Sequence, residues 1–182
     1  MRLSPLAVVA ATIVAVPAIA SVQTMGGGYA KSCYTAAESR FVSQRNIDDC
    51  NLALAEEALP VQDRVATLVN RGILYLRRRD VAHADADFDA ALRIDPNQAE
   101  AWLNKAIVRA RFGKSTDALP HVAKALETGT RKPALAYFVR AMAYEDIGNL
   151  RAAYADLQRA HQLDPNWVEP TIELKRFKVR QL

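Results

Sequence analysis

A unit of about 34 residues recurs in this chain of 182 residues. The tripeptide Asp-Pro-Asn stands at residues 95–97 and again at 164–166, so its two copies are separated by close to two such units. Aligning the chain on these tripeptides gives three windows, residues 65–98, 99–132 and 134–167, with Pro133 as a one-residue insertion. A fixed period of this length restricts the chain to stacked copies of one supersecondary unit.

Small residues occupy the same positions in every window. The eighth, twentieth and twenty-seventh positions are glycine or alanine throughout: Gly72, Ala106 and Ala141, then Ala84, Ala118 and Ala153, then Ala91, Ala125 and Ala160. The fourth and twenty-fourth positions are larger and mostly apolar: Leu68, Trp102 and Tyr137, then Phe88, Val122 and Leu157. Small side chains at helical spacing from large ones allow two antiparallel helices to pack closely. The columns therefore predict a helical hairpin in each window.

Turn signals separate the predicted helices. In Asp-Pro-Asn, the proline cannot continue a helix, and the Asp and Asn side chains accept hydrogen bonds from the amides that a turn leaves free. Gly113 and Gly148 end the first helices of the second and third windows, where we expect a residue in the left-handed conformation. Arg79-Asp80 stands at this place in the first window.

These columns together resemble the tetratricopeptide repeat, a helix–turn–helix unit of 34 residues. The resemblance assigns repeats to residues 65–98, 99–132 and 133–167. Arg109 and Thr130 depart from the family pattern, which has an aromatic residue and a proline there, so the second repeat is the least regular. The resemblance implies an all-α fold, in which antiparallel helix hairpins stack into a short right-handed α-solenoid.

Weaker helical patterns flank the repeats. Residues 33–64 are predicted to form a degenerate helical hairpin, with an amphipathic helix over 47–59 that ends before Pro60. Residues 168–182 are expected to form a capping helix, because the end of a solenoid has to cover its apolar face with a helix whose other side is polar.

The N-terminus differs in kind from the rest of the chain. After one charge at Arg2, an apolar run extends from Leu6 to Ala20 and ends in the small-x-small sequence Ala18-Ile19-Ala20. Such a run is shorter than the about 20 residues that span a bilayer, and it is typical of a secretory signal peptide, residues 1–20, cleaved after Ala20. We expect residues 21–32 to be a flexible lead-in, and the protein to be a periplasmic or secreted bacterial member of the repeat family. The alternative is an uncleaved segment that anchors the chain in the inner membrane.

Two cysteines follow the predicted cleavage site. Export to an oxidising compartment favours a disulfide between Cys33 and Cys50. A hairpin centred near Phe41 and Val42 would bring the two residues opposite one another, whereas a turn near Asn46 would hold them too far apart. Two thiols without a nearby histidine do not form a zinc site.

No set of residues in the sequence indicates catalysis. The three histidines, His83, His121 and His161, fall at different repeat positions and are not aligned by stacking. The sequence has no glycine-rich phosphate loop and no motif of a serine hydrolase or zinc protease. Net charge is +4, but acidic and basic residues are interspersed, without the dense basic block of a nucleic-acid-binding surface. We therefore expect a protein that is not an enzyme, with no cofactor, no metal and no nucleic-acid partner.

A concave groove lined by the first helices is the expected binding surface, by resemblance to the family. Its predicted peptide-binding residues are Val69, Asn70, Ile73, Arg77, Leu103, Asn104, Ile107, Arg111, Phe138, Met142 and Glu145. Asn70 and Asn104 share one repeat position and are expected to bind the backbone of a bound chain. Arg77 and Arg111 share another and are expected to pair with acidic groups.

Some members of the family hold a partner's C-terminal carboxylates with Lys, Asn and Arg. Asn104 matches one of those positions, but Val69, Ile73, Leu135 and Val139 stand at others. We therefore do not expect a carboxylate clamp of this kind.

These features predict a non-catalytic adaptor or scaffold, which binds a peptide or a helix of a protein partner in its groove within the cell envelope. One alternative is a self-associating structural protein that an uncleaved N-terminal segment anchors to the membrane. In another, the groove has no partner, and is either partly filled by the N-terminal segment or merely solvated.

Overall fold

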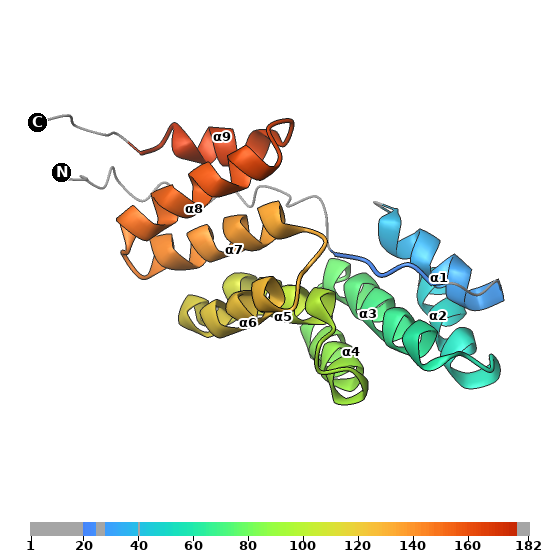
Figure 1. The fold of residues 1–182 in the computed structure, drawn as a ribbon. Coiled ribbons are helices and arrows are strands. Elements are labelled where there is room, and N and C mark those ends of the chain that lie inside the picture. Colours follow the sequence, from blue (N-terminus) through green and yellow to red (C-terminus); the bar gives the residue numbers. More distant parts are fainter. Residues whose placement is uncertain (1–19, 25–27, 40, 178–182) are drawn as a thin grey trace, which may run out of the picture.

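The computed structural model describes residues 20–24, 28–39 and 41–177, and the regular elements in these residues are all α-helices (Figure 1). Nine helices are formed in this part of the chain: α1 (Gly28–Glu38), α2 (Gln44–Glu56), α3 (Val61–Arg77), α4 (Val81–Ile94), α5 (Ala99–Phe112), α6 (Ser115–Glu127), α7 (Pro133–Asp146), α8 (Leu150–Leu163) and α9 (Val168–Leu174). Consecutive helices pack as antiparallel pairs, α3 with α4, α5 with α6 and α7 with α8, and the pairs stack on one another. The predicted all-α solenoid is confirmed.

The helix boundaries follow the repeat closely after the first window. Helix α5 begins at Ala99, the first residue of the second window, and α7 begins at Pro133. Helix α3 instead begins at Val61, four residues before the first window, because Pro60 provides its N-cap residue. Asp63 lies buried in its first turn, where the helix dipole favours a carboxylate.

Large and small side chains alternate within each hairpin. Gly72 of α3 lies against Phe88 of α4, since a Cβ atom built on Gly72 would be 2.6 Å from Phe88 Cε1. The second and third hairpins have alanine at the position of Gly72, and a smaller aliphatic residue at the position of Phe88. All six of these residues are buried, which gives each hairpin a closely packed interior.

The turn within each hairpin takes one of two forms. Arg79 and Gly148 adopt positive φ values, 62° and 79°, between the helices of the first and third hairpins. The expectation of a left-handed residue is wrong at Gly113, whose φ is −119°. There only Gly113 and Lys114 connect α5 to α6, and the chain crosses in an extended conformation instead of turning through a left-handed residue.

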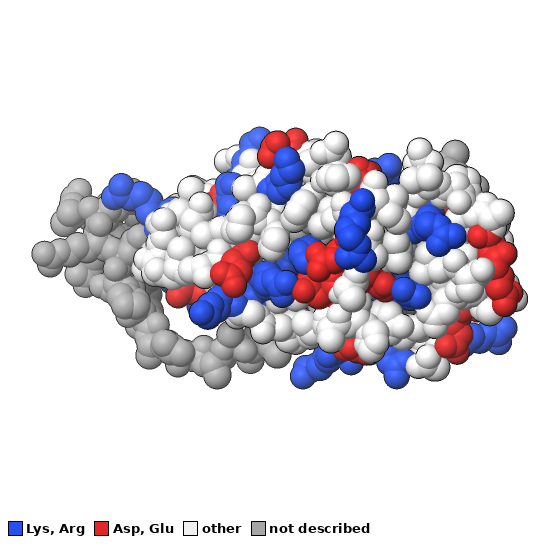
Figure 2. Space-filling model, turned by 90° about the horizontal axis from the view of Figure 1, so that it is seen from below, with Lys and Arg blue, Asp and Glu red and all other residues white. Residues whose placement is uncertain are grey.

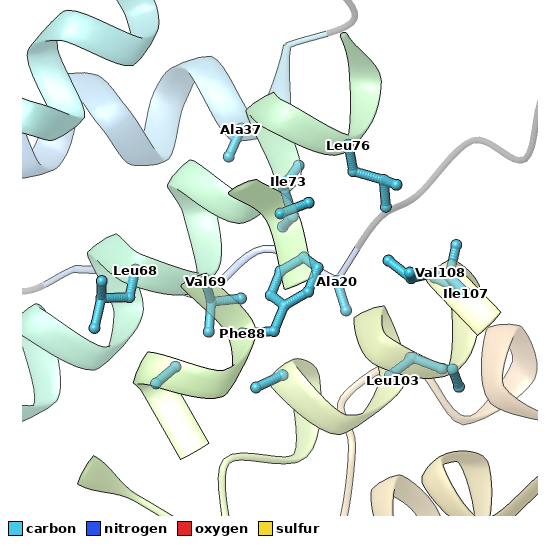
Figure 3. Close-up of a cluster of buried hydrophobic side chains, with 14 of the residues drawn as sticks. Ala20, Ala37, Leu68, Val69, Ile73, Leu76, Phe88, Leu103, Ile107 and Val108 are labelled. Carbon is cyan, nitrogen blue, oxygen red and sulfur yellow. The ribbon is translucent and has the colours of Figure 1, made fainter. Parts of the chain in front are cut away.

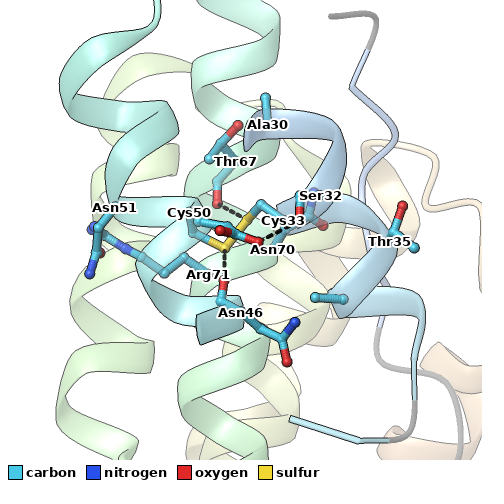
Figure 4. Close-up of a disulfide and its surroundings, with 12 residues drawn as sticks. Ala30, Ser32, Cys33, Thr35, Asn46, Cys50, Asn51, Thr67, Asn70 and Arg71 are labelled. Carbon is cyan, nitrogen blue, oxygen red and sulfur yellow. Dashed lines mark hydrogen bonds between the residues drawn. A yellow bond between two sulfur atoms is a disulfide. The ribbon is translucent and has the colours of Figure 1, made fainter. Parts of the chain in front are cut away.

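The N-terminal hairpin contains the Cys33–Cys50 disulfide (Figure 4). Helices α1 and α2 are joined across Phe41 and Val42, as expected, and the Cα atoms of the two cysteines are 4.9 Å apart. Cys33 Sγ lies 3.9 Å from the carbonyl oxygen of Thr67 in α3. The disulfide therefore joins the two helices at the place where they pack against the first repeat.

The C-terminal end is closed by aromatic contacts. The ring of Trp167, just before α9, is 4.9 Å from that of Phe138 in α7, and Tyr154 is 5.7 Å from Phe177. The expected capping helix over 168–182 is helical to Leu174, and residues 178–182 lie outside the described part of the chain.

The predicted signal peptide lies almost entirely outside the described residues, which include only Ala20 of it. Within the described ranges, none of the helices has both the length and the apolar character needed to cross a bilayer. The expected flexible lead-in, residues 21–32, differs from the structure, because residues 28–32 belong to α1. Two backbone amides at the start of this helix, those of Tyr29 and Ala30, donate to the Glu57 carboxylate at 2.6 and 3.1 Å.

Candidate peptide-binding groove

An extended segment, Ala20–Thr24, lies along the inner face of the first helices, and we call it the strap. In Figure 1 it is the blue chain that runs past α3 toward α1. Its backbone is bound by α5 and then by α3, and the Ser21 hydroxyl donates to Glu38 at the end of α1. The groove predicted from the sequence is therefore occupied in this structure by the chain itself.

Asn70 of α3 binds both backbone groups of one strap residue. The Val22 amide donates to Asn70 Oδ1 at 2.9 Å, and Asn70 Nδ2 donates to the Val22 carbonyl oxygen at 2.7 Å. The Asn70 side chain is fully buried. A buried carboxamide with both of its ends satisfied fixes the position and the direction of an extended chain.

Asn104 of α5, at the same repeat position, binds the strap with one end only. Its Nδ2 donates to the Ala20 carbonyl oxygen at 3.2 Å. Its Oδ1 is buried and has no hydrogen-bond partner. A buried acceptor without a donor is costly, so this half of the groove is incompletely satisfied by the strap.

Ala20 is fully buried and belongs to the main hydrophobic cluster of the molecule. Figure 3 shows its side chain between Ile73 and Leu76 of α3 and Leu103 and Ile107 of α5. Val22, two residues on, is partly buried against the same cluster. Alternate strap residues thus contact the apolar floor of the groove, as expected for an extended chain.

Arg77 and Arg111 occupy different environments despite their shared repeat position. Arg77 Nη1 donates to the carbonyl oxygens of Ala36 and Ser39 and so binds the C-terminal end of α1. Burial lowers the pKa of Arg77, against the attraction of Glu38. Arg111 is exposed, and partial burial together with repulsion from Arg79 lowers its pKa. Arg111 is therefore the cation at the open edge of the groove.

The predicted groove residues of α7 contact the C-terminal end instead of the strap. Phe138 packs on Trp167, and Met142 lies at the edge of the same small cluster. Glu145 accepts a hydrogen bond from Arg176 at 2.8 Å, and its partial burial raises its pKa. The structure thus brings Val69, Asn70, Ile73, Leu103, Asn104 and Ile107 into one buried surface. Phe138 and Met142 lie in a second cluster, and Glu145 pairs with Arg176.

A polar cleft of about 230 Å³ lies beside the strap. Ser21 and Gln23 line it from the strap, and the other lining residues come from α1, α5 and the connection to α7: Tyr34, Glu38, Glu100, Arg131 and Lys132. Glu100 Oε1 accepts a hydrogen bond from the Arg131 amide at 2.9 Å. The strap residues that point away from the apolar floor therefore face a cleft with charges of both signs.

A second, open cleft of about 740 Å³ follows α1 and the turn to α2. Most of its polar lining consists of hydroxyl groups and one amide, and Lys31 is the titratable residue in it. Phe41 stands at its rim with 87% of its surface exposed. Without a cluster of acids, bases or nucleophiles, this lining indicates no chemistry of its own.

Ion pairs between the helices form two repeat columns that the sequence reasoning missed. Arg71 donates two hydrogen bonds to Asp87, at 2.7 and 2.8 Å, and Arg140 binds Asp156 in the same way, at 2.7 and 2.8 Å. In the second repeat, Lys105 stands at the arginine position and pairs instead with two carboxylates of α4, at 2.6 and 3.0 Å. Over the face shown in Figure 2, charges of both signs are interspersed. In the sequence, the arginines and aspartates of these ion pairs stand at the seventh and twenty-third positions of the windows.

Nothing in the described residues forms a catalytic or metal-binding cluster. No group of three or more His, Cys, Asp or Glu side chains in this part of the chain could hold a metal ion. His121 stacks on Trp102 with ring centroids 5.6 Å apart, and Trp102 Nε1 donates to the Pro96 carbonyl oxygen at 2.8 Å. These side chains stabilise the packing of the second repeat.

The fold and the groove define a helical-repeat interaction module, and comparison with known proteins supports the tetratricopeptide repeat as its unit. Residues 134–166, the third repeat, match the family model of the tetratricopeptide repeat. No curated protein sequence matches the chain. The predicted repeat family is thus supported by the sequence of the third repeat, and the repeat fold is supported by solved structures.

Three solved structures illustrate the structural similarity. The first tetratricopeptide domain of human RPAP3 has a TM-score of 0.58 and 25% identity, over 62% of this chain and 87% of that chain. The first such domain of Spaghetti (RPAP3), solved bound to the HSP90 peptide SRMEEVD, has a TM-score of 0.58 and 25% identity, over 62% of this chain and 88% of that chain. MamA from Desulfovibrio magneticus RS-1, with 22% identity, shares the fold at a TM-score of 0.58, over 81% of this chain and 82% of that chain.

Proposed function

We propose that this protein is a non-catalytic interaction module, an adaptor or scaffold that binds an extended segment of a partner protein in the groove of α3 and α5. The observation that carries the proposal is the pair of hydrogen bonds between Asn70 and the backbone of Val22. Every peptide offers the same backbone groups, so a carboxamide placed in this way is a general receptor for an extended chain. The apolar floor beside it supplies contacts for alternate side chains.

The peptide-bound relative supports this function. The Spaghetti domain, at 25% identity, was solved with a bound peptide. In this chain, Val69 and Ile73 form a buried, apolar part of the groove floor. We therefore propose a partner segment with apolar anchors instead of a carboxylate-rich tail.

We further propose that the protein works in the cell envelope after export, with residues 1–20 removed as a signal peptide. The support is the apolar run that ends in Ala18-Ile19-Ala20, together with a disulfide, which persists in oxidising compartments. Mass spectrometry of the N-terminus of the protein isolated from its cells tests this. A chain that begins at Ser21 is expected, and a chain that retains residues 1–20 would refute the cleavage.

Site-specific photocrosslinking in the native cells tests the interaction. A photoreactive residue at Arg111, at the open edge of the groove, is expected to form an adduct with a protein of defined mass. The same residue at Arg93, exposed on α4, is the matched control. The adduct should be lost when Asn70→Ala and Asn104→Ala are combined. Equal adducts at both positions, or an adduct that survives the double substitution, would remove the groove from the function. Arg77 is unsuitable for this test because it binds α1.

A second candidate function, self-association of an anchored chain, is favoured by the last helix. Val168 and Ile172 lie one turn apart on α9, with 61% and 49% of their surfaces exposed. An apolar face at the end of a solenoid can continue the stack into another copy. Light scattering decides this: a dimer or larger species that dissociates on Val168→Asp with Ile172→Asp would support self-association, and a monomer would exclude it.

A further inference from the structure

We propose that Ala20–Val22 occupies the place of the partner in the groove, and that the partner replaces it with an extended segment of the pattern small residue, any residue, apolar residue. This inference rests on the proposed function and specifies the ligand of the same groove. It also makes binding competitive, because the partner segment and the strap need the same atoms of Asn70 and Asn104.

The direction and register of the ligand follow from the two asparagines. Ala20 is bound by α5 and Val22 by α3, so an extended chain crosses the groove from the second repeat to the first as it runs from N to C. The two contacts are two residues apart, the spacing at which an extended chain presents the same side. A partner bound by both asparagines takes the same direction and register.

The side-chain preferences follow from burial. Ala20 has no exposed surface, so the floor beneath it has no room for a larger side chain without displacement of Ile73 or Leu103. Val22 is partly buried and packs against the same cluster. Ser21 and Gln23 line the polar cleft, and the Gln23 side chain is exposed. The groove therefore selects the first and third residues of the segment and tolerates variety at the second.

The strap satisfies the groove incompletely. Asn104 Oδ1 is buried without a donor, and so is the Thr24 hydroxyl oxygen. Asn70 Oδ1 accepts a hydrogen bond from the Val22 amide, whereas Asn104 binds only the carbonyl group of Ala20. A partner segment that donates an amide to Asn104 Oδ1 makes one more buried hydrogen bond than the strap, which gives it the means to displace the strap.

Competition from within the chain is strong because the strap is tethered. A short tether gives an effective concentration on the order of millimolar, so a free peptide of equal affinity competes poorly below that concentration. The proposed cleavage after Ala20 would remove the residue bound by Asn104 and leave Val22 on Asn70. The processed protein is then expected to bind a partner segment more tightly than the full-length chain.

Fluorescence anisotropy with a labelled peptide of the strap sequence, PAIASVQT, residues 17–24, tests the proposal on the full-length chain. Val22→Asp places a charge against the apolar floor and should release the strap, so that this variant binds the peptide at least tenfold more tightly than the unmodified chain. Gln23→Asp places the same charge at the exposed neighbouring position and should leave the affinity unchanged. Adding Asn70→Ala to the Val22→Asp variant should abolish binding, and so should Ala20→Trp in the peptide.

Equal affinities of the unmodified chain and the Val22→Asp variant would overturn the proposal, and so would a Val22→Asp variant that binds no peptide. Hydrogen exchange on the unmodified chain gives a second measurement that does not depend on a variant. An excess of the peptide should accelerate exchange of the chain's own Val22 amide, and unchanged exchange at millimolar peptide would overturn the proposal as well. In each of these cases, a groove-specific adduct at Arg111 would leave the proposed function standing, whereas loss of that adduct would remove the function itself.

Discussion

At the scale of single residues, packing in this protein depends on matched volumes. Gly72 has no side chain because the ring of Phe88 occupies that space. The third hairpin solves the same problem with Ala141 and Leu157, which are both buried. The columns of small and large residues were predicted from the sequence, but the individual pairing of glycine with phenylalanine required the structure.

Gly72→Ala tests this matching. Alanine favours the helix by about 1 kcal/mol, but its Cβ would overlap Phe88, and overpacking costs typically about 1–3 kcal/mol, so we expect a net destabilisation of up to about 2 kcal/mol. The same substitution in a Phe88→Leu background, which reproduces the pairing of the third hairpin, should not destabilise the protein further. Urea unfolding of the four members of this cycle measures both effects, and equal losses in both backgrounds would contradict steric overlap as the cause.

The two asparagines show how far residue-level prediction of the site reached. Their shared repeat position predicted that they bind the backbone of a bound chain, and in the structure both contact the backbone of the strap. The sequence did not determine which segment occupies the groove, since local spacings do not specify contacts with distant parts of the chain. Arg77 differs from Arg111 for a related reason: only the position of α1 determines that Arg77 binds its last carbonyl groups.

At the scale of helices, an arginine–aspartate ion pair joins the two helices of the first repeat and of the third repeat, and the second repeat lacks this pair. Where the other repeats have arginine and aspartate, it has Lys105 and His121. Lys105 pairs with Asp85 and Asp89 of the preceding hairpin, and Arg109 also binds Asp85, at 2.7 Å. The irregular repeat therefore exchanges an ion pair within the hairpin for ion pairs between hairpins.

Because His121 stands at the aspartate position of the second repeat, we expect the free energy of unfolding to depend on pH near neutrality. Burial lowers the pKa of His121 below its ordinary value of 6.5, and repulsion from Lys105 and Arg109 outweighs the opposing attraction of Asp85 and Asp89. The folded protein thus binds this proton more weakly than the unfolded chain, so the contribution is complete above pH 6.5 and is lost as pH falls through the folded pKa. We expect the free energy of unfolding to decrease from about pH 7 to pH 5, less steeply in His121→Gln. Parallel curves for the two proteins would contradict this assignment.

The pH range matters for the interpretation of that experiment. Burial of Asp85 opposes its ionisation, but hydrogen bonds and charge attraction from Arg109 and Lys105 prevail and lower its pKa below 3.8. Its contribution to stability is therefore present above pH 3.8 and is lost only as pH falls through the lower, folded pKa. Measurements kept at pH 5 and above therefore separate His121 from this carboxylate.

The disulfide stabilises the N-terminal hairpin of α1 and α2. It closes a loop between residues 17 apart in sequence, and a loop of that size corresponds to about 3 kcal/mol through the lost entropy of the unfolded chain. We expect Cys33→Ser with Cys50→Ser to lower the free energy of unfolding by about that amount, as measured in urea. Dithiothreitol should destabilise the natural chain and leave the double variant unchanged. A natural chain whose midpoint does not respond to reductant would contradict the prediction.

At the scale of the whole molecule, the sequence predicted the repeated part, and it left filling of the groove by the N-terminal segment as one of several alternatives. The hairpins and their order follow from a local period, because each contact lies within one repeat or between neighbours. The strap follows from no such period: the amide of Asn104 reaches Ala20, 84 residues earlier in the chain. The sequence also did not predict that α3 begins four residues before its window. Pro60 predicts the end of one helix, whereas in the structure it stands directly before the first residue of α3.

The burial of Ala20 fixes an order of events for an exported chain. A leader peptidase has to hold its substrate in its own cleft, and here Ala20, on one side of the bond to Ser21, is fully buried against α3 and α5. Processing therefore has to precede the closing of the helices over this bond, so translocation and folding compete in time. An exported molecule that folds before cleavage would retain residues 1–20. The same gene would then produce a cleaved form and an uncleaved form, in proportions determined by the rates of folding and of cleavage.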